Sequence, residues 1–249
     1  MKTTIAALAD IHGNTPALAA VLYDMREAGI ERAYNLGDTL YGPLDPAGTY
    51  WALRTCGIEM VHILGNGDRI LLEAGEDASP TVRHTLAHLE REHLDWLKSL
   101  PAIHEDNFIF ACHGSPKNDM EYLVEHLEPG GVTLRADTEL VRLLEGVRQS
   151  LVLCGHSHLH HAVRVSHGPL VVNPGSVGLP AYADNDPPVP HVMESGSPHA
   201  RYAVLDVHLG HWEVQFRCVP YDHESAAAMA AENGRPDWAE AIRSGRAGL

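Results

Sequence analysis

The sequence predicts a single α/β domain in which a parallel β-α-β unit is followed by antiparallel strands. Three observations indicate this class: buried apolar runs end at polar residues, an amphipathic helix separates the first two runs, and strand-turn-strand patterns fill the second half. At 249 residues, the chain can bury one sizeable core, and its length is compatible with one domain or a tight pair of domains. Hydrophobic residues at 45% and charged residues at 20% are typical of globular proteins. We therefore expect one domain over residues 1–249.

The opening unit begins with an apolar strand over residues 3–9. A helix over residues 16–28 follows, because Thr15 and Pro16 suit a helix start, apolar residues recur at helical spacing, and Gly29 ends the pattern. Two further strands are expected over residues 32–36 and 59–64, each ending at a glycine.

The next segments alternate in the same way. A helix is expected over residues 81–97, with Val82, Leu86, Leu89 and Leu97 on one face. Strands are expected over 107–112 and 151–154, then strand pairs over 162–166 with 170–172 and over 202–208 with 212–218. Residues 181–199 are rich in proline and predict a long surface loop, and residues 224–249 predict C-terminal helices with a helical pattern from 224 to 243.

The charge balance restricts the partners. Lys and Arg number 18 and Asp and Glu 33, which gives a net charge of −15 with histidine neutral. Such a field repels polyanions, so broad nucleic-acid binding is not expected. A small phosphorylated substrate remains compatible with this charge, because bound metal ions invert the field within a pocket. The oligomeric state stays open.

Cysteine usage and the first residues bear on the compartment. The four cysteines are scattered without C-x-x-C spacing, which disfavours a disulfide framework or a thiolate zinc site. The apolar run before Asp10 is too short for a signal segment or a membrane span. We therefore expect a cytoplasmic protein without a membrane partner.

Polar residues directly follow five of the predicted strands. Parallel strands in α/β sheets direct their carboxyl ends toward a shared ligand crevice, so these residues are candidates for a site. Each fits an ordinary strand-end residue when taken alone, but the ordered set of carboxylates, an amide and imidazoles suits Mn, Fe or Zn. The candidate ligands are Asp10, His12, Asp38, Asn66, His113, His156 and His158.

The series D-x-H, G-D, G-N-x-D, H-G and G-H-x-H over residues 10–158 resembles the calcineurin-like metallophosphoesterase superfamily. The runs D-I-H-G-N from Asp10 and N-P-G-S-V from Asn173 are similar to its small bacterial phosphodiesterase branch. The resemblance implies a four-layer α-β-β-α sandwich, with two mixed sheets flanked by helices and a dinuclear site at one edge of the sheets.

The family roles carry over to the matching positions. Asp10, His12 and His158 would bind one metal ion, Asn66, His113 and His156 the other, and Asp38 would bridge them. The resemblance implies two divalent transition-metal ions, Mn first and Fe, Zn or Ni as alternatives, with in-line attack by a bridging hydroxide. Asn66 is also expected to contact the phosphate.

One position departs from the family pattern. Phosphatase members commonly have a histidine after G-N to assist the leaving group, whereas this chain has Gly67. Asp68, which orients that group in the family, is retained as a candidate catalytic residue. Either another histidine such as His191 or His199 supplies a proton, or the substrate has a leaving group that needs little help.

Three residues near the motifs are candidate substrate contacts: Asn14, Gly67 and Arg69. Asn14 fits equally well as a loop or cap residue, and Arg69 as a surface ion pair. The expected function is metal-dependent hydrolysis of P–O esters, most simply of phosphodiesters. The alternatives are a nucleotide pyrophosphatase or diadenosine-polyphosphate hydrolase, a phosphomonoesterase, and a non-catalytic scaffold with the same fold.

Overall fold

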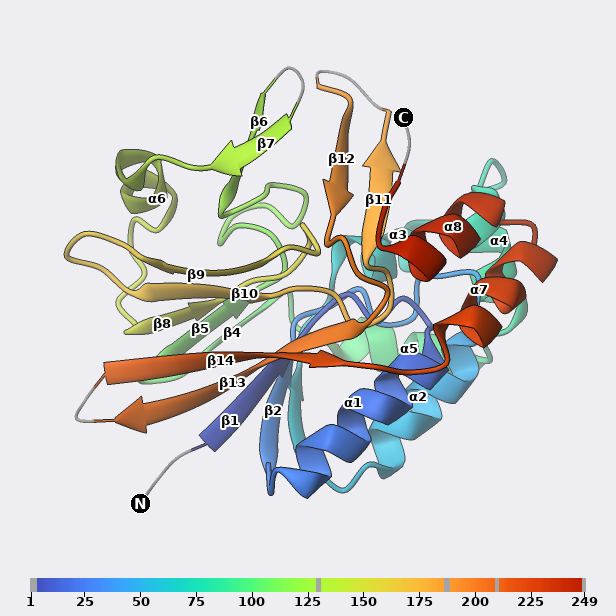
Figure 1. Cartoon of the computed structure of the whole chain (residues 1–249), viewed down its shortest axis with the longest axis horizontal. Coiled ribbons are helices and arrows are strands. Elements are labelled where there is room, and N and C mark those ends of the chain that lie inside the picture. The colour runs from blue at the N-terminus through green and yellow to red at the C-terminus, as the bar shows by residue number, and fades with distance from the viewer. Residues whose placement is uncertain (1–3, 129–130, 186–188, 209–210, 248–249) are drawn as a thin grey trace.

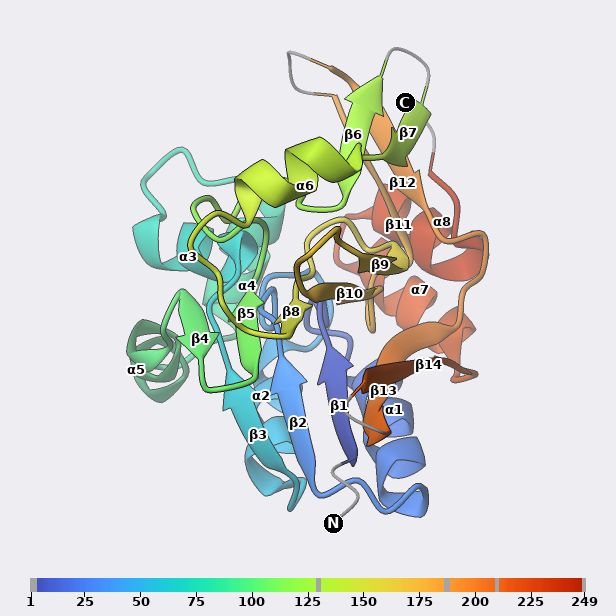
Figure 2. The same cartoon turned by 90° about the vertical axis from the view of Figure 1, so that its left-hand side faces the viewer.

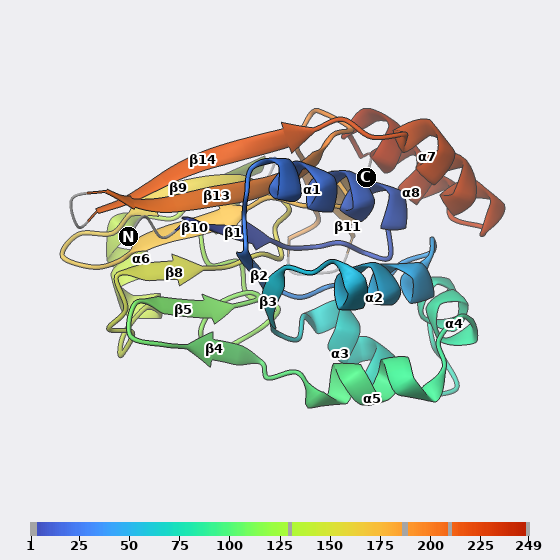
Figure 3. The same ribbon diagram turned by 90° about the horizontal axis from the view of Figure 1, so that it is seen from below.

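The computed structural model describes residues 4–128, 131–185, 189–208 and 211–247. Two five-stranded mixed β-sheets pack face to face, and helices cover the outer side of each sheet (Figure 1, Figure 3). This arrangement confirms the α-β-β-α order that the family resemblance implies. Thr3, the first residue of the predicted opening strand, lies outside the described residues.

The first sheet has the strand order β14-β13-β1-β2-β3. Its parallel part comprises β1 (Thr4–Leu8), β2 (Arg32–Asn35) and β3 (Glu59–His62). Helices α1 (Thr15–Glu27) and α2 (Pro46–Thr55) connect these strands, so both crossovers place a helix on the sheet. The antiparallel pair is β13 (Ala200–His208) and β14 (His211–Val219), as predicted.

The second sheet has the order β4-β5-β8-β10-β9. Strands β5, β8 and β10 are parallel, and β4 and β9 pair antiparallel at the two edges. The predicted strands occur with small shifts at their ends, and β4 is an addition. The bounds are β4 Ile103–Glu105, β5 Ile109–Cys112, β8 Leu151–Leu153, β9 His160–Arg164 and β10 Leu170–Pro174.

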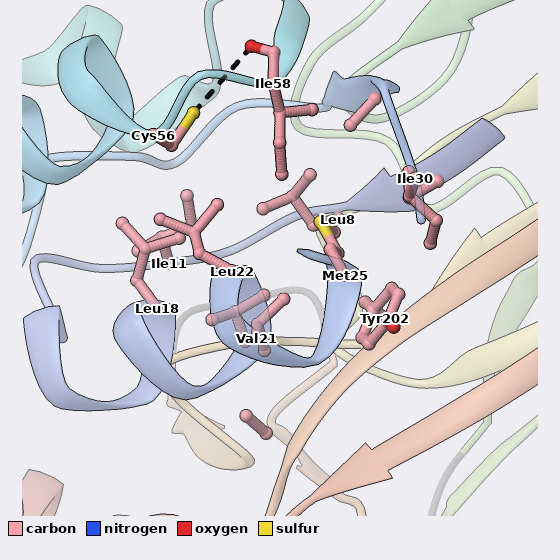
Figure 4. Close-up of a cluster of buried hydrophobic side chains, with 14 of the residues drawn as sticks. Leu8, Ile11, Leu18, Val21, Leu22, Met25, Ile30, Cys56, Ile58 and Tyr202 are labelled. Carbon is pink, nitrogen blue, oxygen red and sulfur yellow. Dashed lines mark hydrogen bonds between the residues drawn. The ribbon is translucent and has the colours of Figure 1, made fainter. Parts of the chain in front are cut away.

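Alternation along the strands divides the core into layers. From β1, Leu8 lies in one hydrophobic cluster with Leu18 and Met25 of α1 (Figure 4). Ala7 belongs instead to the cluster between the two sheets. On the far side of the second sheet, Val152 packs against helix α6 (Asp137–Leu143). Because both faces of the central strands are buried, these strands read as continuous apolar runs.

The helix predicted over residues 81–97 is wrong as one element. The structure has α4 (Pro80–Ala87) and α5 (Arg91–Ser99) instead. His88 ends α4, and Glu90 begins α5 in a capping box in which the Glu90 N–H donates to Nδ1 of His93 at 2.8 Å. The break lets Val82 and Leu97 enter the same hydrophobic cluster from two helices. Helix α3 (Asn66–Glu73) precedes them, and like α2 it was not predicted.

The surface loop predicted over residues 181–199 is also wrong in part. Strands β11 (Ala181–Asp184) and β12 (His191–Glu194) form a hairpin in which Ala181, His191 and Met193 are buried. Strand β12 lies against β7 (Gly131–Leu134), which pairs with β6 (Glu125–Glu128). The two hairpins stand together beyond the ends of the sheets (Figure 2). Residues 186–188 of the predicted loop lie outside the described residues.

Helices α7 (His223–Glu232) and α8 (Pro236–Ser244) confirm the predicted C-terminal helices. Their alanines pack against Leu44 and Leu179 beside the β11–β12 hairpin. Within the described chain, every helix is too short or too polar to cross a membrane.

Candidate metal centre

The seven side chains predicted as metal ligands all follow strand ends on the same edge of the two sheets. Asp10 and His12 follow β1, Asp38 follows β2, and Asn66 begins α3 after β3. His113 follows β5, and His156 and His158 follow β8. The parallel direction of these strands brings residues that are far apart in the sequence to one place.

The backbone at these residues is unusual. Within the described ranges, the non-glycine residues with positive φ are His167 and five of the candidate ligands. Each such residue costs on the order of 1–3 kcal/mol, so the surrounding structure must hold it in place. The five are Asp10, His12, Asp38, His156 and His158, with φ from 51° to 71°.

Backbone hydrogen bonds continue the β1–β2 pairing past the strand ends and hold these turns. The N–H of Asp10 donates to the Gly37 carbonyl at 3.0 Å, and the N–H of His12 donates to the Asp38 carbonyl at 2.9 Å. Gly37 has φ +97°, and a β-carbon there would lie 2.5 Å from the Gly65 nitrogen. A glycine is therefore required where the loops carrying Asp38 and Asn66 approach each other.

His12 and His158 direct unprotonated nitrogens at one another. Nδ1 of His12 donates to the Tyr41 carbonyl at 2.7 Å, and Nδ1 of His158 donates to the Leu179 carbonyl at 2.6 Å. A neutral imidazole carries one N–H, so both Nε2 atoms present lone pairs across 3.1 Å. Burial lowers the pKa of both histidines, which favours this neutral form. Two facing acceptors are the arrangement that a cation stabilises.

Asp10 adds a carboxylate to the same cluster. Its Oδ1 lies 3.6 Å from Nε2 of His158, and among the described residues this buried oxygen has no hydrogen-bond partner. Its Oδ2 accepts the His156 N–H at 3.2 Å, which ties the two sheets together. Burial raises the pKa of Asp10 well above its ordinary value, and nearby Asp38 adds to the rise. An unpartnered buried carboxylate oxygen fits a metal ligand.

His113 and Asn66 form the second part of the centre. Nδ1 of His113 donates to the Leu36 carbonyl at 2.7 Å, and its Nε2 lies 2.8 Å from Oδ1 of Asn66. Burial opposes the charged imidazolium, but the carboxylates of Asp38 and Asp10 raise the pKa of His113. A proton on Nε2 therefore occupies the position that a metal ion would take.

Asp38 lies between the two groups of histidines. Its Oδ2 is 3.8 Å from Nε2 of His12, and its Oδ1 is 3.5 Å from Nε2 of His113. Burial opposes ionisation of Asp38, but the neighbouring histidines and the N–H of Gly67, 2.7 Å from Oδ1, lower its pKa. In the described parts of the chain, two sets of three residues have ligand atoms close enough for one cation each: Asp10, His12 and His158, and Asp10, Asp38 and His113.

His156 is half-buried at the rim. Its Nε2 lies 3.2 Å from the Met120 carbonyl, which leaves Nδ1 as the ligand atom. Burial lowers its pKa to about 3, so the ring is neutral. The ring stacks on Tyr122 at 4.7 Å, and the Tyr182 hydroxyl donates to the His156 carbonyl at 3.2 Å.

Asp68 supports the Asp38 turn. Its carboxylate accepts the N–H groups of Thr39 and Leu40 at 2.9 Å each. Burial and the Asp38 charge raise its pKa to about 6. The carboxylate is fully buried beneath the turn, so the structure places it where it holds the backbone that carries Asp38. These hydrogen bonds support the Asp38 turn, and the catalytic role of Asp68 stays a prediction.

Gly67 lies in α3 without a positive φ, so space explains the glycine. A β-carbon there would lie 2.9 Å from Cβ and Cγ of Tyr41 and 3.0 Å from Oδ2 of Asp38. The Tyr41 side chain thus fills the space beside position 67. Because glycine has no side chain, only its backbone could make the substrate contact predicted for Gly67.

Two predicted substrate contacts are used otherwise. Asn14 is buried, caps α1 by accepting the Ala17 N–H, and donates Nδ2 to the Gly178 carbonyl and the Tyr221 hydroxyl. All the hydrogen-bonding groups of its side chain are therefore engaged in the fold, as the cap alternative expects, and the substrate contact stays a prediction. Arg69 pairs with both carboxylate oxygens of Asp119, at 2.7 and 3.0 Å, and with Glu73. In the structure, Arg69 therefore forms the surface ion pairs that were the alternative to a substrate contact.

A cavity of about 740 Å³ lies over the cluster. His12, Asp38, Asn66, His156 and His158 line its floor, and its walls come from both hairpins and α8. Sequence reasoning missed most wall residues, because they belong to no motif and lie far from the ligands in the sequence. His191 lines the cavity, and its Nε2 is 2.9 Å from the Tyr122 hydroxyl. His199 is not among the lining residues. The missed wall residues include Tyr41, Tyr122, His126, Arg135, Tyr182, Arg235 and Trp238.

A sequence model of the calcineurin-like phosphoesterase superfamily domain matches residues 3–197. The chain belongs to this superfamily. The match includes the turns that carry all seven candidate ligands, and metal dependence is a property of the superfamily. The Asp and His clusters described above fit such ions by their donor atoms and by the orphaned oxygen of Asp10.

Several known proteins align with nearly the whole length of this calcineurin-like phosphoesterase. The uncharacterized protein MJ0912 of Methanocaldococcus jannaschii is 26% identical over 96% of both chains. A metallophosphoesterase from Sphaerobacter thermophilus has a TM-score of 0.74 at 24% identity, covering 98% of this chain and 99% of that one. The hypothetical protein PH1004 from Pyrococcus horikoshii has a TM-score of 0.73 at 23% identity with the same coverage. These solved structures share the fold.

Proposed function

We propose that this protein is a divalent-metal-dependent phosphodiesterase that hydrolyses P–O ester bonds in small molecules. The observation that carries the proposal is the convergence of His12 and His158, whose lone pairs face each other across 3.1 Å beside the orphaned Oδ1 of Asp10. Two three-residue groups among the described residues, Asp10 with His12 and His158 and Asp10 with Asp38 and His113, have ligand atoms close enough for one cation each, which supports the proposal.

Asp10, His12 and His158 would hold one ion, Asn66, His113 and His156 a second, and Asp38 would contact both. The imidazole-rich donor set suits Mn²⁺, our first choice, or Fe, Zn or Ni. Bound ions would supply Lewis acidity and would lower the pKa of water for in-line attack on phosphorus.

The remaining residues orient these ligands and shape the substrate space. Backbone carbonyls of Tyr41, Leu36 and Leu179 fix the tautomers of three histidines. Two tyrosines hold His156 in place: the Tyr122 ring stacks on its imidazole, and the Tyr182 hydroxyl donates to its backbone carbonyl. The amide of Asn66 lines the cavity and would also contact the phosphoryl group.

The absence of a proton-donating side chain at position 67 favours a diester as substrate. A phosphomonoester with an alkoxide leaving group gains typically 10²–10⁴-fold from a positioned acid. Position 67 has no titratable side chain, and the ring of Tyr41 occupies its surroundings. A diester with a good leaving group loses less from this absence. A phosphoanhydride, as in a nucleotide pyrophosphatase or diadenosine-polyphosphate hydrolase, is the alternative on the same argument.

The test combines metal content with matched substrates. Protein purified without chelator is analysed for metals, and rates are then measured on bis(p-nitrophenyl) phosphate and p-nitrophenyl phosphate. We expect divalent metal, loss of activity on chelation with recovery on adding Mn²⁺, and faster hydrolysis of the diester. Metal-free protein that neither binds added Mn²⁺ nor hydrolyses any ester would instead favour a non-catalytic scaffold. Faster hydrolysis of the monoester would favour a phosphomonoesterase.

A further inference from the structure

The cavity over the metal centre is larger than a phosphate group requires. Its volume of about 740 Å³ is in the range of pockets that bind whole small molecules. The hairpins β6–β7 and β11–β12 rise together on the side away from the helices α1 and α2 (Figure 2). The part of a substrate beyond the scissile phosphoryl group would therefore contact residues of these hairpins.

Two arginines line this cavity in a chain with a net charge of −15. Arg235 is already committed within the protein. Its Nε and Nη2 bind the carboxylate of Asp237, and its guanidinium lies over the Trp238 ring at 5.3 Å. An anion would have to compete with Asp237 for this side chain.

Arg135, at the end of β7, is held differently. Its Nε donates to the Tyr122 carbonyl at 3.0 Å, and its side chain is 15% exposed. Its Nη2 lies 4.0 Å from Oε1 of Glu121, and its Nη1 lies 3.9 Å from Oε1 of Glu139. These separations are beyond hydrogen-bond length. Among the described residues, the two terminal nitrogens donate no hydrogen bond within 3.5 Å.

The two glutamates are partly engaged elsewhere. Glu121 Oε2 accepts the Ser115 hydroxyl at 2.7 Å, and Glu139 Oε2 accepts the Ala136 N–H at 3.3 Å. Their carboxylates partly balance the charge of Arg135, but they do not accept hydrogen bonds from its two terminal nitrogens. The terminal nitrogens are not among the fully buried polar atoms without a partner, so they are accessible from the cavity that Arg135 lines and can donate to an anion there. The planar fork matches the two oxygens of a phosphate or carboxylate.

We propose that Arg135 is a specificity-determining residue that binds a second anionic group of the substrate, a phosphate or a carboxylate. The substrate class is then a small organic phosphodiester with an additional anion remote from the scissile bond. This inference rests on the proposed phosphodiesterase activity. The Nε contact also links Arg135 through Tyr122 to the ring of His156, so the anion site and the metal centre share one support.

The test uses p-nitrophenyl alkyl phosphates that differ only in the terminal group, which is methyl, carboxylate or phosphate, on a short and a long alkyl chain. We expect wild-type kcat/KM to be about 10- to 100-fold higher for one of the anionic ends than for methyl, chiefly through KM. The end group with the larger gain identifies the anion. In Arg135→Gln the ratio of anionic to methyl substrate falls to near one, and Arg135→Lys retains part of it.

Arg142→Gln on α6 is the matched control, because Arg142 is exposed and does not line the cavity. We expect it to keep the wild-type ratio, and melting temperatures check that all variants fold. Equal wild-type rates on all three end groups at both chain lengths would overturn the inference and leave the phosphodiesterase proposal standing.

If the metal-loaded wild type hydrolyses none of these diesters, the proposed function fails instead. Calorimetric binding of alkyl monophosphonates and α,ω-bisphosphonates to the wild type and Arg135→Gln then decides the inference separately. Tighter binding of the bisphosphonate that is lost in Arg135→Gln supports the anion site, and equal binding refutes it.

Discussion

The side chain of Tyr41 occupies the space into which a side chain at position 67 would extend. Its Cβ and Cγ lie 2.9 Å from the place of a β-carbon on Gly67, closer than such atoms normally approach. The backbone carbonyl of Tyr41 also accepts Nδ1–H from His12 at 2.7 Å. One residue therefore both orients a candidate metal ligand and prevents a histidine at position 67.

This relationship predicts that Gly67→His alone is poorly tolerated. The new β-carbon would displace Tyr41 and press on Oδ2 of Asp38, so we expect a lower melting temperature and weaker metal binding. Removing the tyrosine side chain in Tyr41→Gly/Gly67→His makes room for the imidazole. We expect the double variant to recover metal content and to hydrolyse monoesters faster relative to diesters than the wild type, as measured by elemental analysis and paired rate assays. A well-folded, metal-loaded Gly67→His single variant would contradict the steric argument.

Asp38 is expected to be the most damaging ligand to lose. Its two oxygens face His12 and His113 separately, so Asp38→Ala should release both ions and abolish hydrolysis. His158→Ala should weaken mainly one site. Metal stoichiometry in the two variants measures the difference, with Asp77→Ala as an exposed control. Full occupancy and activity in Asp38→Ala would refute a dinuclear centre that shares this carboxylate.

Metal uptake is expected to displace protons. Burial lowers the pKa of His12, His156 and His158, so these rings bind a metal ion without first losing a proton. The pKa of His113 is raised, with the Asp38 and Asp10 carboxylates outweighing burial, so a proton must leave this ring. Calorimetry in buffers of different ionisation enthalpy should detect proton release that grows as pH falls below neutrality.

Activity on the acid side should then fall together with metal content. Loss of activity at mildly acidic pH while the ions stay bound would require a separate titrating base. An absence of proton release in the calorimetry would contradict the charged state inferred for metal-free His113.

Glu125 predicts a pH dependence of stability outside the metal centre. Burial raises its pKa to about 7, its Oε1 accepts the Ser157 hydroxyl at 2.6 Å, and His161 lies 3.5 Å away. Because the folded-state pKa exceeds the unfolded value, this group stabilises the fold fully below about pH 4.5, and the contribution is lost as pH rises through about 7.

Glu125→Gln removes this titration. Relative to the wild type, the variant should gain unfolding free energy between pH 5 and pH 8, on the order of 2–3 kcal/mol for the raised pKa. Denaturant unfolding at both pH values measures the gain, and Glu128→Gln on the exposed face of β6 is the control. A difference between Glu125→Gln and the wild type that does not change with pH would show that Glu125 does not titrate in this range.

Several features of the molecule follow from short stretches of sequence. Strands such as β5 and β8 are recognisable because both of their faces are buried, so their residues form continuous apolar runs. The polar residue after each run marks the sheet edge, which is why Asp38 and His113 could be predicted as neighbours. The break between α4 and α5 was missed, because apolar residues on both sides of it keep a helical spacing while entering one cluster.

The sequence alone determined which strands end in polar residues and which donor types these residues offer at the metal centre. Strand periodicity and turn chemistry act over a few residues, so both can be recognised locally. Only the tertiary structure decided what surrounds those donors. Tyr41 meets Gly67, Asn14 binds Gly178 and Tyr221, and Arg135 extends from a hairpin into the cavity. These contacts join segments that are far apart in the sequence and meet only when the sheets, hairpins and C-terminal helices pack together. Which side chains fill or bury each contact therefore cannot be predicted from the neighbouring residues in the sequence.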